Sequence, residues 1–284
     1  METIAPTHKG FTPAFYDRYL VPMSFLPFAR ETAQRLSRSP VRRLLETACG
    51  TGVVTYAMAD SLPAGTEIVA TDINQAMVEF AAGKQHRPEI VWRVADAQDL
   101  PFSDAEFDAA VCQFGAMFFP DRRRAFHETR RVLGKEGAYV LITWDKLEQN
   151  ELQHVIVQQF ERLFPDDPPQ TMRKVGFGYN DPNTIRVDLQ SAGFGDVEIE
   201  AVEKTIMVNS AEDAAIGFCQ GASSRNDIEA RDPTGLARVT EAVARSLEQR
   251  FGVGPFTVTA RALYISAACL RDMKAVERCG RMKR

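Results

Sequence analysis

Short apolar runs alternate with helical patterns between residues 41 and 144 of the chain. The apolar runs lie at residues 43–46, 67–71, 90–94, 107–112 and 138–144. Patterns with the period of a helix lie between them, at residues 53–62, 75–82 and 122–133. Strands that alternate with helices form βαβ units, so this part of the chain predicts an α/β fold with a parallel sheet.

Polar and glycine residues mark the expected ends of these helices. Asn74 and Asp121 precede two of them, and their short side chains can accept hydrogen bonds from free N–H groups of the first turn. Gly83 and Gly134 follow the same two helices. We expect both glycines to end their helices, because glycine is common just after the last helical turn.

The pattern changes after residue 144. Helices are predicted at residues 148–164, 181–192, 211–220 and 236–250, and strands at residues 197–208 and 256–268. About fifty residues separate the last two strands, far more than a simple connection between strands needs. We interpret residues 1–30, 146–183 and 209–254 as lid or substrate elements on a single domain that covers residues 1–284, with its core at about 36–145, 184–208 and 255–270. The alternative is that these three segments only enlarge the hydrophobic core.

Composition and charge narrow the classes of protein. The 284 residues are 45% hydrophobic, and 34 Lys and Arg against 38 Asp and Glu give a net charge of -4. This balance argues against a protein that binds nucleic acid or anionic lipid through its overall charge. The five cysteines form no C-x-x-C pair and no zinc spacing, so we interpret them as reduced thiols and expect no metal. The amino-terminal residues do not resemble a secretory signal, and no apolar stretch is long enough for a membrane span, so a cytoplasmic location is expected.

A turn of small residues joins the first strand to the first helix at residues 47–52, directly after Glu46. Two kinds of ligand compete for such a turn. A dinucleotide fingerprint would need a glycine where Thr55 stands. In addition, the carboxylate of Glu46 would repel a pyrophosphate, and it suits a ligand that carries an ammonium or sulfonium group.

With these residues the chain resembles the class I S-adenosylmethionine-dependent methyltransferases, and within them the group of the ubiquinone and menaquinone biosynthesis C-methyltransferases. The family motif, acidic-x-Gly-x-Gly-x-Gly, matches residues 46–52 except that Ala48 replaces the first glycine. Because alanine adopts a positive φ only at a cost, we expect an ordinary backbone conformation at Ala48. The resemblance implies a Rossmann-like, doubly wound α/β fold: a mostly parallel seven-stranded sheet with an antiparallel last strand and helical lid insertions.

Further matches extend the resemblance over residues 40–145, about a third of the chain. Asp72 ends the second strand, where the family's acid accepts hydrogen bonds from the ribose hydroxyls. Asp96 ends the third strand, where the family's acid and the next N–H meet the adenine. Residues 99–108 and 131–137 match the family's passage through the fourth and fifth strands. The cofactor site implied by the resemblance consists of Tyr16, Tyr19, Glu46, Ala48, Gly50, Thr51, Gly52, Asp72, Ile73, Met77, Asp96, Ala97, Gln98, Gln113 and Phe114.

The segment 113–121, after the fourth strand, lies beside the transferable methyl in the family. Its aromatic and Met side chains suit an apolar or aromatic acceptor, and we expect Met117, Phe118 and Trp144 to contact it. An alternative is that Phe118 and Phe119 pack under the next helix, as we expect of one of them. Cys49 and Cys112 are interpreted as packed apolar residues.

Methyl transfer is an in-line displacement, so alignment and exclusion of water matter more than any one catalytic group. The catalytic residue is therefore unknown. His154, Tyr16 and Tyr19 are the candidates, although His154 also fits a plain exposed position, and His127 is interpreted as a surface residue. His8 falls in the terminal segment.

The leading hypothesis is an enzyme that transfers the methyl of S-adenosylmethionine to O, C or N of a small, partly apolar or aromatic acceptor and releases S-adenosylhomocysteine. The chain is then a monomer or a homodimer with a small-molecule partner. One alternative is a non-catalytic S-adenosylmethionine-binding protein that acts through a partner protein. Another is an RNA methyltransferase, whose support is the basic segments 122–124 and 281–284. The family members that methylate DNA or glutamine carry an Asn-Pro-Pro-Tyr-like motif, which residues 112–115 do not match.

Overall fold

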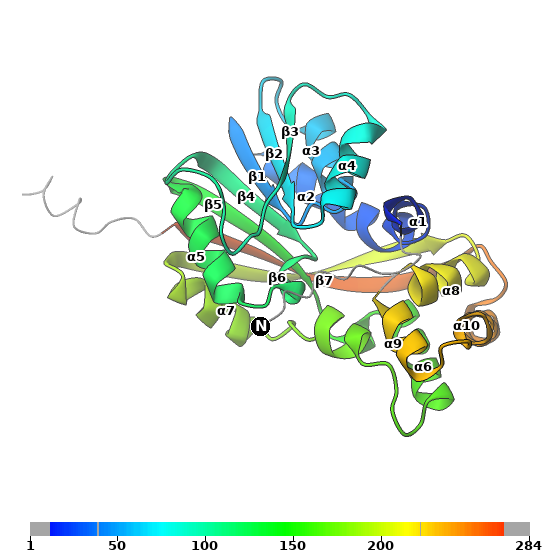
Figure 1. The fold of residues 1–284 in the computed structure, drawn as a ribbon. Coiled ribbons are helices and arrows are strands. Elements are labelled where there is room, and N and C mark those ends of the chain that lie inside the picture. Colours follow the sequence, from blue (N-terminus) through cyan, green and yellow to red (C-terminus); the bar gives the residue numbers. More distant parts are fainter. Residues whose placement is uncertain (1–11, 39, 222, 270–284) are drawn as a thin grey trace, which may run out of the picture.

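The computed structural model describes residues 12–38, 40–221 and 223–269. His8, Cys279 and the basic segment 281–284 lie outside the described residues. The described chain contains one sheet of seven strands in the order β3-β2-β1-β4-β5-β7-β6 (Figure 1). The strands are β1 (Arg43–Thr47), β2 (Glu67–Asp72), β3 (Ile90–Val94), β4 (Phe107–Gln113), β5 (Leu133–Trp144), β6 (Phe194–Val208) and β7 (Phe256–Cys269).

Strands β1 to β5 are parallel, and β7 runs antiparallel between β5 and β6. The predicted mostly parallel sheet with an antiparallel last strand is therefore confirmed. Helices cover both of its faces, with α2, α3 and α4 on one side and α5 and α7 on the other (Figure 1). Their bounds are α2 (Leu26–Leu36), α3 (Val53–Ser61), α4 (Gln75–Lys84), α5 (Arg122–Val132) and α7 (Pro182–Ser191).

Strands β6 and β7 are the longest and extend beyond the rest of the sheet, where a second group of helices packs (Figure 1). We call this group the helical lobe; it consists of α6 (Glu151–Leu163), α8 (Ala211–Gln220), α9 (Ser224–Arg231) and α10 (Leu236–Phe251). Within the lobe α10 packs against α6 and α8. Its apolar residues Val239, Val243 and Leu247 are buried, as their spacing on one helical face predicts.

Several short elements complete the chain. They are the helix α1 (Pro13–Tyr19), the π-helices η1 (Val21–Phe25) and η4 (Met172–Gly176), and the 3-10 turns η2 (Ala116–Phe118) and η3 (Leu147–Gln149). The sequence pattern did not indicate α2 or α9. In α9 only Ser224 and Ile228 are buried, so this helix has almost no apolar face for a periodicity to reveal.

Two predicted helix ends were wrong. Gly83 does not end α4, which continues to Lys84; a side chain at Gly83 would meet only open space, so nothing there forces a turn. Gly134 lies in β5, because this strand begins at Leu133, which pairs with Phe107 of β4. The N-caps were right: Asn74 accepts a hydrogen bond from the Ala76 N–H, and Asp121 accepts one from Arg124.

Candidate cofactor and acceptor site

The carboxyl ends of β1, β2, β3 and β4 meet at one edge of the sheet, and the turn after β1 lies at the centre of this edge (Figure 1). In this turn Ala48, Gly50 and Gly52 have φ angles of 56°, 54° and 81°. The expectation of an ordinary conformation at Ala48 was therefore wrong. The turn needs the left-handed region at this position as well, and Ala48 adopts it despite the steric cost of its Cβ.

The glycines of this region serve different purposes. A Cβ on Gly52 would lie 2.8 Å from Cη2 of Trp92, so Gly52 allows α3 and β3 to approach. A Cβ on Gly115, just after β4, would lie 2.4 Å from the Cβ of Ala48, so the alanine occupies space that Gly115 leaves free. Gly115 was not predicted from the sequence, although a glycine just after a buried strand was a usable signal. A Cβ on Gly50 would meet no protein atom within 4 Å, which leaves room for a ligand against the backbone.

Two buried carboxylates lie beside the turn. Glu46 is only 2% exposed, and its Oε2 accepts a 2.6 Å hydrogen bond from the hydroxyl of Thr55. Burial raises the pKa of Glu46 to about 8, and the nearby charge of Asp72 adds to the effect. Asp72 accepts hydrogen bonds from the Gly50 N–H at 2.8 Å and from the Asn74 N–H at 2.9 Å, and burial raises its pKa too. A cationic ligand would stabilise the ionised form of both carboxylates.

Thr51 supplies a further polar group at the turn. Its side chain is buried, and its hydroxyl has no hydrogen-bond partner among the residues that the structure describes. A buried hydroxyl without a partner is costly, and a ligand that bonds to it removes this cost. The open space at Gly50, the buried acids and this hydroxyl are consistent with the group that the resemblance implies.

The residues predicted to surround the adenine lie at the ends of β2 and β3. Asp96 accepts hydrogen bonds from the backbone and side-chain amides of Gln98 at 2.8 Å and 3.2 Å. Ala97 is buried beside them, Met77 is buried on α4, and Ile73 is 49% exposed. Asp96 thus orders the loop after β3, while Ile73 leaves an apolar surface open beside it.

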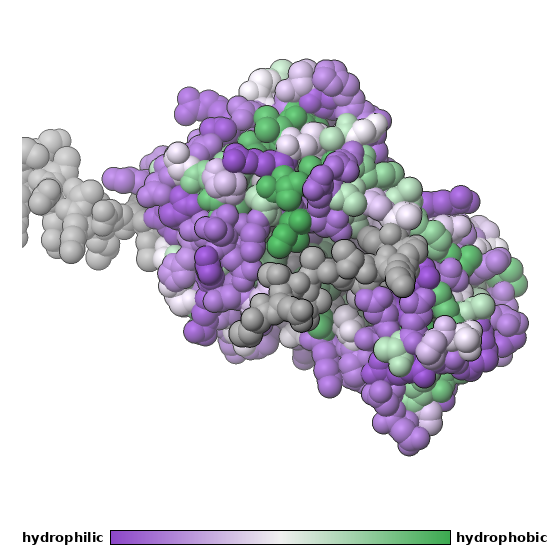
Figure 2. Space-filling view, in the orientation of Figure 1, coloured by the Kyte–Doolittle hydropathy of each residue, from purple (hydrophilic) through white to green (hydrophobic). Residues whose placement is uncertain are grey.

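Figure 2 shows that polar residues cover most of one face of the molecule and that a narrow hydrophobic strip lies near its middle. Exposed apolar side chains that follow the sheet edge are Ile73, Val94 and Phe118. They follow or end β2, β3 and the turn after β4. Three of the exposed large apolar side chains therefore belong to segments at the carboxyl edge of the sheet.

Helix α1 brings Tyr16 and Tyr19 to different neighbours. Tyr16 stacks on Phe25 with ring centroids 5.5 Å apart, and its pKa is raised by burial and then by the charges of Asp72 and Asp17. Tyr16 is therefore close to the Asp72 carboxylate. Tyr19 lies against α8, where its Cβ would be 3.2 Å from a Cβ on Gly217.

An aromatic cluster lies beside the glycine turn, at the carboxyl ends of β4 and β5. Phe114 stacks on Trp144 with centroids 3.9 Å apart and an interplanar angle of 13°. Phe177 stacks on Trp144 at 5.7 Å, and Phe25 contacts Trp144 at 6.2 Å. The sequence predicted Trp144 and Phe114 but not Phe25 and Phe177, which come from segments far away in the chain and share no motif with them.

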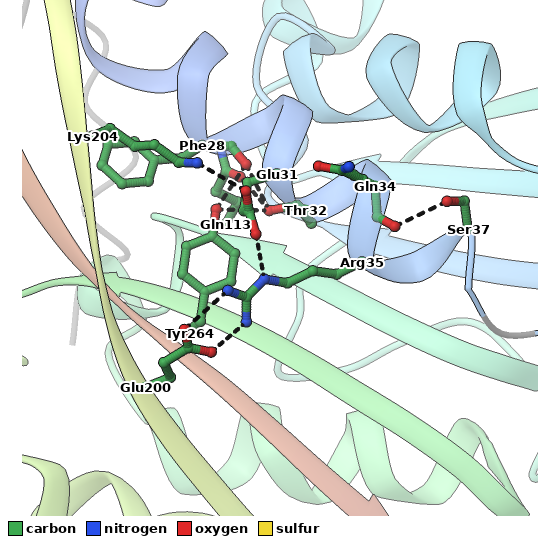
Figure 3. A network of polar contacts seen from close by, with 10 residues as sticks. All are labelled: Phe28, Glu31, Thr32, Gln34, Arg35, Ser37, Gln113, Glu200, Lys204 and Tyr264. Carbon is green, nitrogen blue, oxygen red and sulfur yellow. Dashed lines mark hydrogen bonds and ion pairs between the residues drawn. The ribbon is translucent and has the colours of Figure 1, made fainter.

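Gln113, at the end of β4, contacts Thr32 of α2 (Figure 3) and also Phe25 of η1, which directly precedes α2. Its Oε1 lies 2.9 Å from the Thr32 hydroxyl, and its Nε2 donates to the Phe25 carbonyl at 3.3 Å. The Tyr264 hydroxyl donates to the Phe28 carbonyl at 2.8 Å, next to the ion pairs that join Arg35 to Glu31 and Glu200 (Figure 3). In these contacts Gln113 anchors α2 and positions Phe25.

The other residues named from the sequence have plainer surroundings. Met117 is buried, Phe118 is 53% exposed, and Phe119 is partly buried against the core, so one of the two phenylalanines packs as expected. His154 lies on α6 in hydrogen-bond contact with Gln158. His127 is exposed, as predicted. Cys49 and Cys112 are buried, and burial raises the pKa of the Cys112 thiol to about 11.

A groove of about 830 Å³ lies elsewhere, at the amino ends of β1 and β4. Its lining includes Val41, Asp108 and Glu200, and none of the predicted cofactor residues. The groove is therefore separate from the edge that carries the glycine turn. In the described residues no helix is long and apolar enough to span a membrane, and no three His, Cys, Asp or Glu side chains gather as a metal site would require.

Residues 45–141 match the family described as a methyltransferase domain. The ubiquinone/menaquinone biosynthesis C-methyltransferase UbiE of Citrifermentans bemidjiense is 36% identical over 104 residues, which are 35% of this chain and 44% of that protein. The demethylmenaquinone methyltransferase of Thermotoga maritima is 38% identical over 100 residues, 35% of this chain and 42% of that protein. The chain thus spans less than half the length of these two curated relatives.

Solved structures share the fold over a longer range. A Haemonchus contortus phosphoethanolamine N-methyltransferase 2, in complex with S-adenosylhomocysteine, has a TM-score of 0.58 at 14% identity and covers 90% of this chain and 56% of its own. Residues 45–141 thus match a methyltransferase domain, and the described chain has the fold of S-adenosylmethionine-dependent methyltransferases of known structure. Its sequence relatives are the ubiquinone and menaquinone C-methyltransferases, as the glycine turn and the two strand-end acids predicted.

Proposed function

We propose that the whole chain is an enzyme that transfers the methyl group of S-adenosylmethionine to a small, partly apolar or aromatic acceptor. The observation that carries this proposal is the pair of buried carboxylates, Glu46 and Asp72, beside a turn whose Gly50 leaves open space. Two acids with raised pKa values favour a ligand with positive charge, and S-adenosylmethionine carries an ammonium and a sulfonium.

When bound, S-adenosylmethionine supplies an electrophilic methyl group. Asp72 holds the turn through the Gly50 N–H and has lone pairs left for the ribose hydroxyls. Asp96, Ala97 and Ile73 form the surface for the adenine, and Tyr16 covers the site from α1. These groups orient the ligand and exclude water, which is the main demand of an in-line displacement.

The acceptor side of the proposal rests on the aromatic cluster. Trp144, Phe114 and Phe177 form a rigid apolar wall, and Met117 and Phe118 lie next to it in the chain. These three rings are buried, so the face that is open to a flat aromatic ring belongs to Phe118, which is 53% exposed. The names of the curated relatives point the same way, since demethylmenaquinone contains a quinone ring. We therefore propose a quinol or another electron-rich aromatic ring as the acceptor class, with the methylated atom left open between C, O and N.

The segments around 1–30, 146–183 and 209–254 are assigned to the acceptor side in this proposal, within one domain. Cys49, Cys112, Cys219 and Cys269 are free, which supports a reducing, cytoplasmic setting. The acceptor is a small molecule, and the chain acts as a monomer or a homodimer. The proposed catalytic contribution of His154, Tyr16 or Tyr19 is a proton transfer that some acceptors require and others do not.

Isothermal titration with S-adenosylhomocysteine tests the cofactor site. Asp72→Ala removes two hydrogen bonds to the ribose and should weaken binding by about 2 to 3 kcal/mol, or roughly 30- to 150-fold. Asp108→Ala is the matched control, because Asp108 also accepts two backbone hydrogen bonds, from Arg42 and Arg43, at the other edge of the sheet. Both variants should lose stability, and only Asp72→Ala should lose affinity. Equal affinity in the two variants would contradict the site.

A transfer assay with labelled S-adenosylmethionine and a panel of hydroquinones and catechols tests the reaction. Label in an extracted small molecule supports the proposal. Cofactor binding without transfer, together with a stable complex with another protein, would favour a non-catalytic protein that acts through a partner. Transfer to RNA, with an affinity that falls steeply with salt, would favour an RNA methyltransferase.

A further inference from the structure

The short helix α1 lies between the cofactor turn and the helical lobe. It contacts α4 of the core on one side and α8 of the lobe on the other (Figure 1). None of its seven residues is fully buried. A helix of this length is not stable by itself, so its position depends on the few contacts that hold it.

On the core side α1 is held by Lys84, the last residue of α4. Its Nζ lies 2.8 Å from Oδ1 of Asp17 and donates to the carbonyl of Thr51 in the glycine turn at 3.3 Å. The same ammonium lies 5.6 Å from the ring centroid of Tyr56 and 5.8 Å from that of Phe80. A single cation therefore ties α1 directly to the backbone of the turn that we assign to the cofactor.

On the lobe side α1 rests on Gly217 of α8 and on Gly221, which directly follows this helix. A Cβ on Gly217 would lie 3.2 Å from the Cβ of Tyr19, and one on Gly221 would lie 3.0 Å from the ring of Phe15. Ordinary side chains at these positions would push α1 away. The two glycines thus leave the space that Phe15 and Tyr19 occupy.

Between these two contacts α1 presents Tyr16. The charge of Asp72 contributes to the raised pKa of Tyr16, and the ring of Tyr16 stacks on Phe25. Phe25 in turn contacts Phe114 at 5.7 Å and Trp144 at 6.2 Å. Helix α1 therefore contacts α8 of the lobe and, through Phe25, is joined to the acceptor wall.

We propose that Lys84 is a positioning residue that latches α1 across the cofactor site, and that α1 transmits occupation of this site to α8 and the acceptor wall. The proposal rests on the proposed function, because it takes the glycine turn as the site of S-adenosylmethionine. A ligand bound under Tyr16 adds contacts to α1, and these contacts restrain Phe15 and Tyr19 against Gly217 and Gly221. The contacts of α1 with α8 and with Phe25 are then more stable when the cofactor is bound.

The test uses Lys84→Met, which keeps an unbranched apolar stem against Tyr56 and removes the charge, and Lys84→Arg, which restores it. Lys204→Met is the matched control: Lys204 forms a 2.8 Å ion pair with Glu31, and its side chain is 27% exposed against 28% for Lys84. Two quantities are measured for the full chain. They are the dissociation rate of S-adenosylhomocysteine and the amide hydrogen exchange of peptides that cover α1 and α8, with and without that ligand.

The dissociation rate should rise about 10-fold in Lys84→Met, return to within about 2-fold of the original chain in Lys84→Arg, and stay unchanged in Lys204→Met. S-adenosylhomocysteine should slow exchange in α1 and α8 of the original chain, and it should not slow α8 in Lys84→Met. An unchanged dissociation rate in Lys84→Met, or an equal effect in Lys204→Met, would overturn the latch. If the ligand slowed amide exchange in α1 but not in α8 of the original chain, the proposed transmission from the cofactor site to α8 would be overturned. Failure of the original chain to bind the ligand would instead refute the proposed function.

Discussion

The cofactor half and the acceptor half of the site are built in different ways. In the cofactor half, the partners are close in sequence: Glu46 bonds to Thr55, and Asp72 bonds to the backbone of Gly50 and Asn74. In the acceptor half, Phe25, Trp144 and Phe177 come from three separate segments and meet only in the folded chain.

This difference has a physical origin. The cofactor half works through backbone N–H groups and positive φ angles, and these need glycine or a small residue at fixed positions. The acceptor half works through the shape of an apolar wall, which many combinations of side chains can form. A family motif therefore covers residues 45–141, while the helical lobe has no such motif. In this chain the identity of the cofactor is fixed more tightly than the identity of the acceptor.

Gly50→Ala is the change with the largest expected effect on this comparison. A Cβ at position 50 meets no protein atom within 4 Å, so it should cost only about 1 kcal/mol of stability through its φ of 54°. This Cβ fills the space in which we place the ligand. It should weaken the binding of S-adenosylhomocysteine at least ~100-fold, or by about 2.7 kcal/mol. Gly65→Ala is the control, because Gly65 also has a positive φ and open space but lies before β2. Titration and thermal unfolding of both variants measure the two effects, and a similar affinity in both would contradict a ligand at the turn.

The pH dependence of stability should show a second, smaller effect of the cofactor half. Burial raises the pKa of Glu46 from 4.5 to about 8, so the protonated form is favoured in the folded chain. The stabilisation that comes from protonated Glu46 is fully present below pH 4.5 and is lost as the pH rises through 8. The free energy of unfolding should therefore fall by about 1 kcal/mol per pH unit between pH 5 and 7.5.

Glu46→Gln keeps the hydrogen bond to Thr55 and does not titrate. Denaturant unfolding at pH 5, 6, 7 and 8 should therefore give a difference in free energy of unfolding between the two proteins that shifts in favour of the variant as the pH rises. Since other groups titrate in both proteins, only this difference reports Glu46. A constant difference over this range would show that Glu46 is already ionised in the fold.

The sequence predicted most of the sheet and the starts of two helices, because the apolar pattern of a buried strand and the N-cap residue of a helix are local signals. All seven strands lie within the predicted ranges or extend them, and Asn74 and Asp121 cap their helices as expected. The prediction from sequence failed where tertiary contacts override the local conformational preference of a residue. Gly134 resembles a helix end, but pairing between Leu133 and Phe107 draws it into β5. Ala48 resembles an ordinary turn residue, but the turn requires a positive φ there.

The acceptor half was predictable only in part. Trp144 and Phe114 follow from their places at strand ends, where ligands of parallel sheets bind. Phe25 is the last residue of one short π-helix and Phe177 directly follows another, and the irregular geometry of these turns leaves no periodicity in the sequence. Gly217 and Gly221 stand in or next to a helix, where glycine carries no signal until α1 is seen to pack on them. The contacts that join two distant segments were the ones a single sequence could not provide.

Phe118→Ala should have the smallest effect on the fold and act only on the acceptor half. Phe118 is 53% exposed next to the aromatic wall, so its loss should change the free energy of unfolding by less than about 0.5 kcal/mol. Stacking on an aromatic acceptor contributes about 0.5 to 1.5 kcal/mol, so KM for the acceptor found in the transfer assay should rise roughly 2- to 10-fold. The affinity for S-adenosylhomocysteine should not change. Val187→Ala is the control, since Val187 is 55% exposed on α7 and away from the wall. If Phe118→Ala left the acceptor KM at the Val187→Ala value, the exposed phenylalanine would be an ordinary surface residue, and the acceptor side of the site would be limited to the buried rings around Trp144.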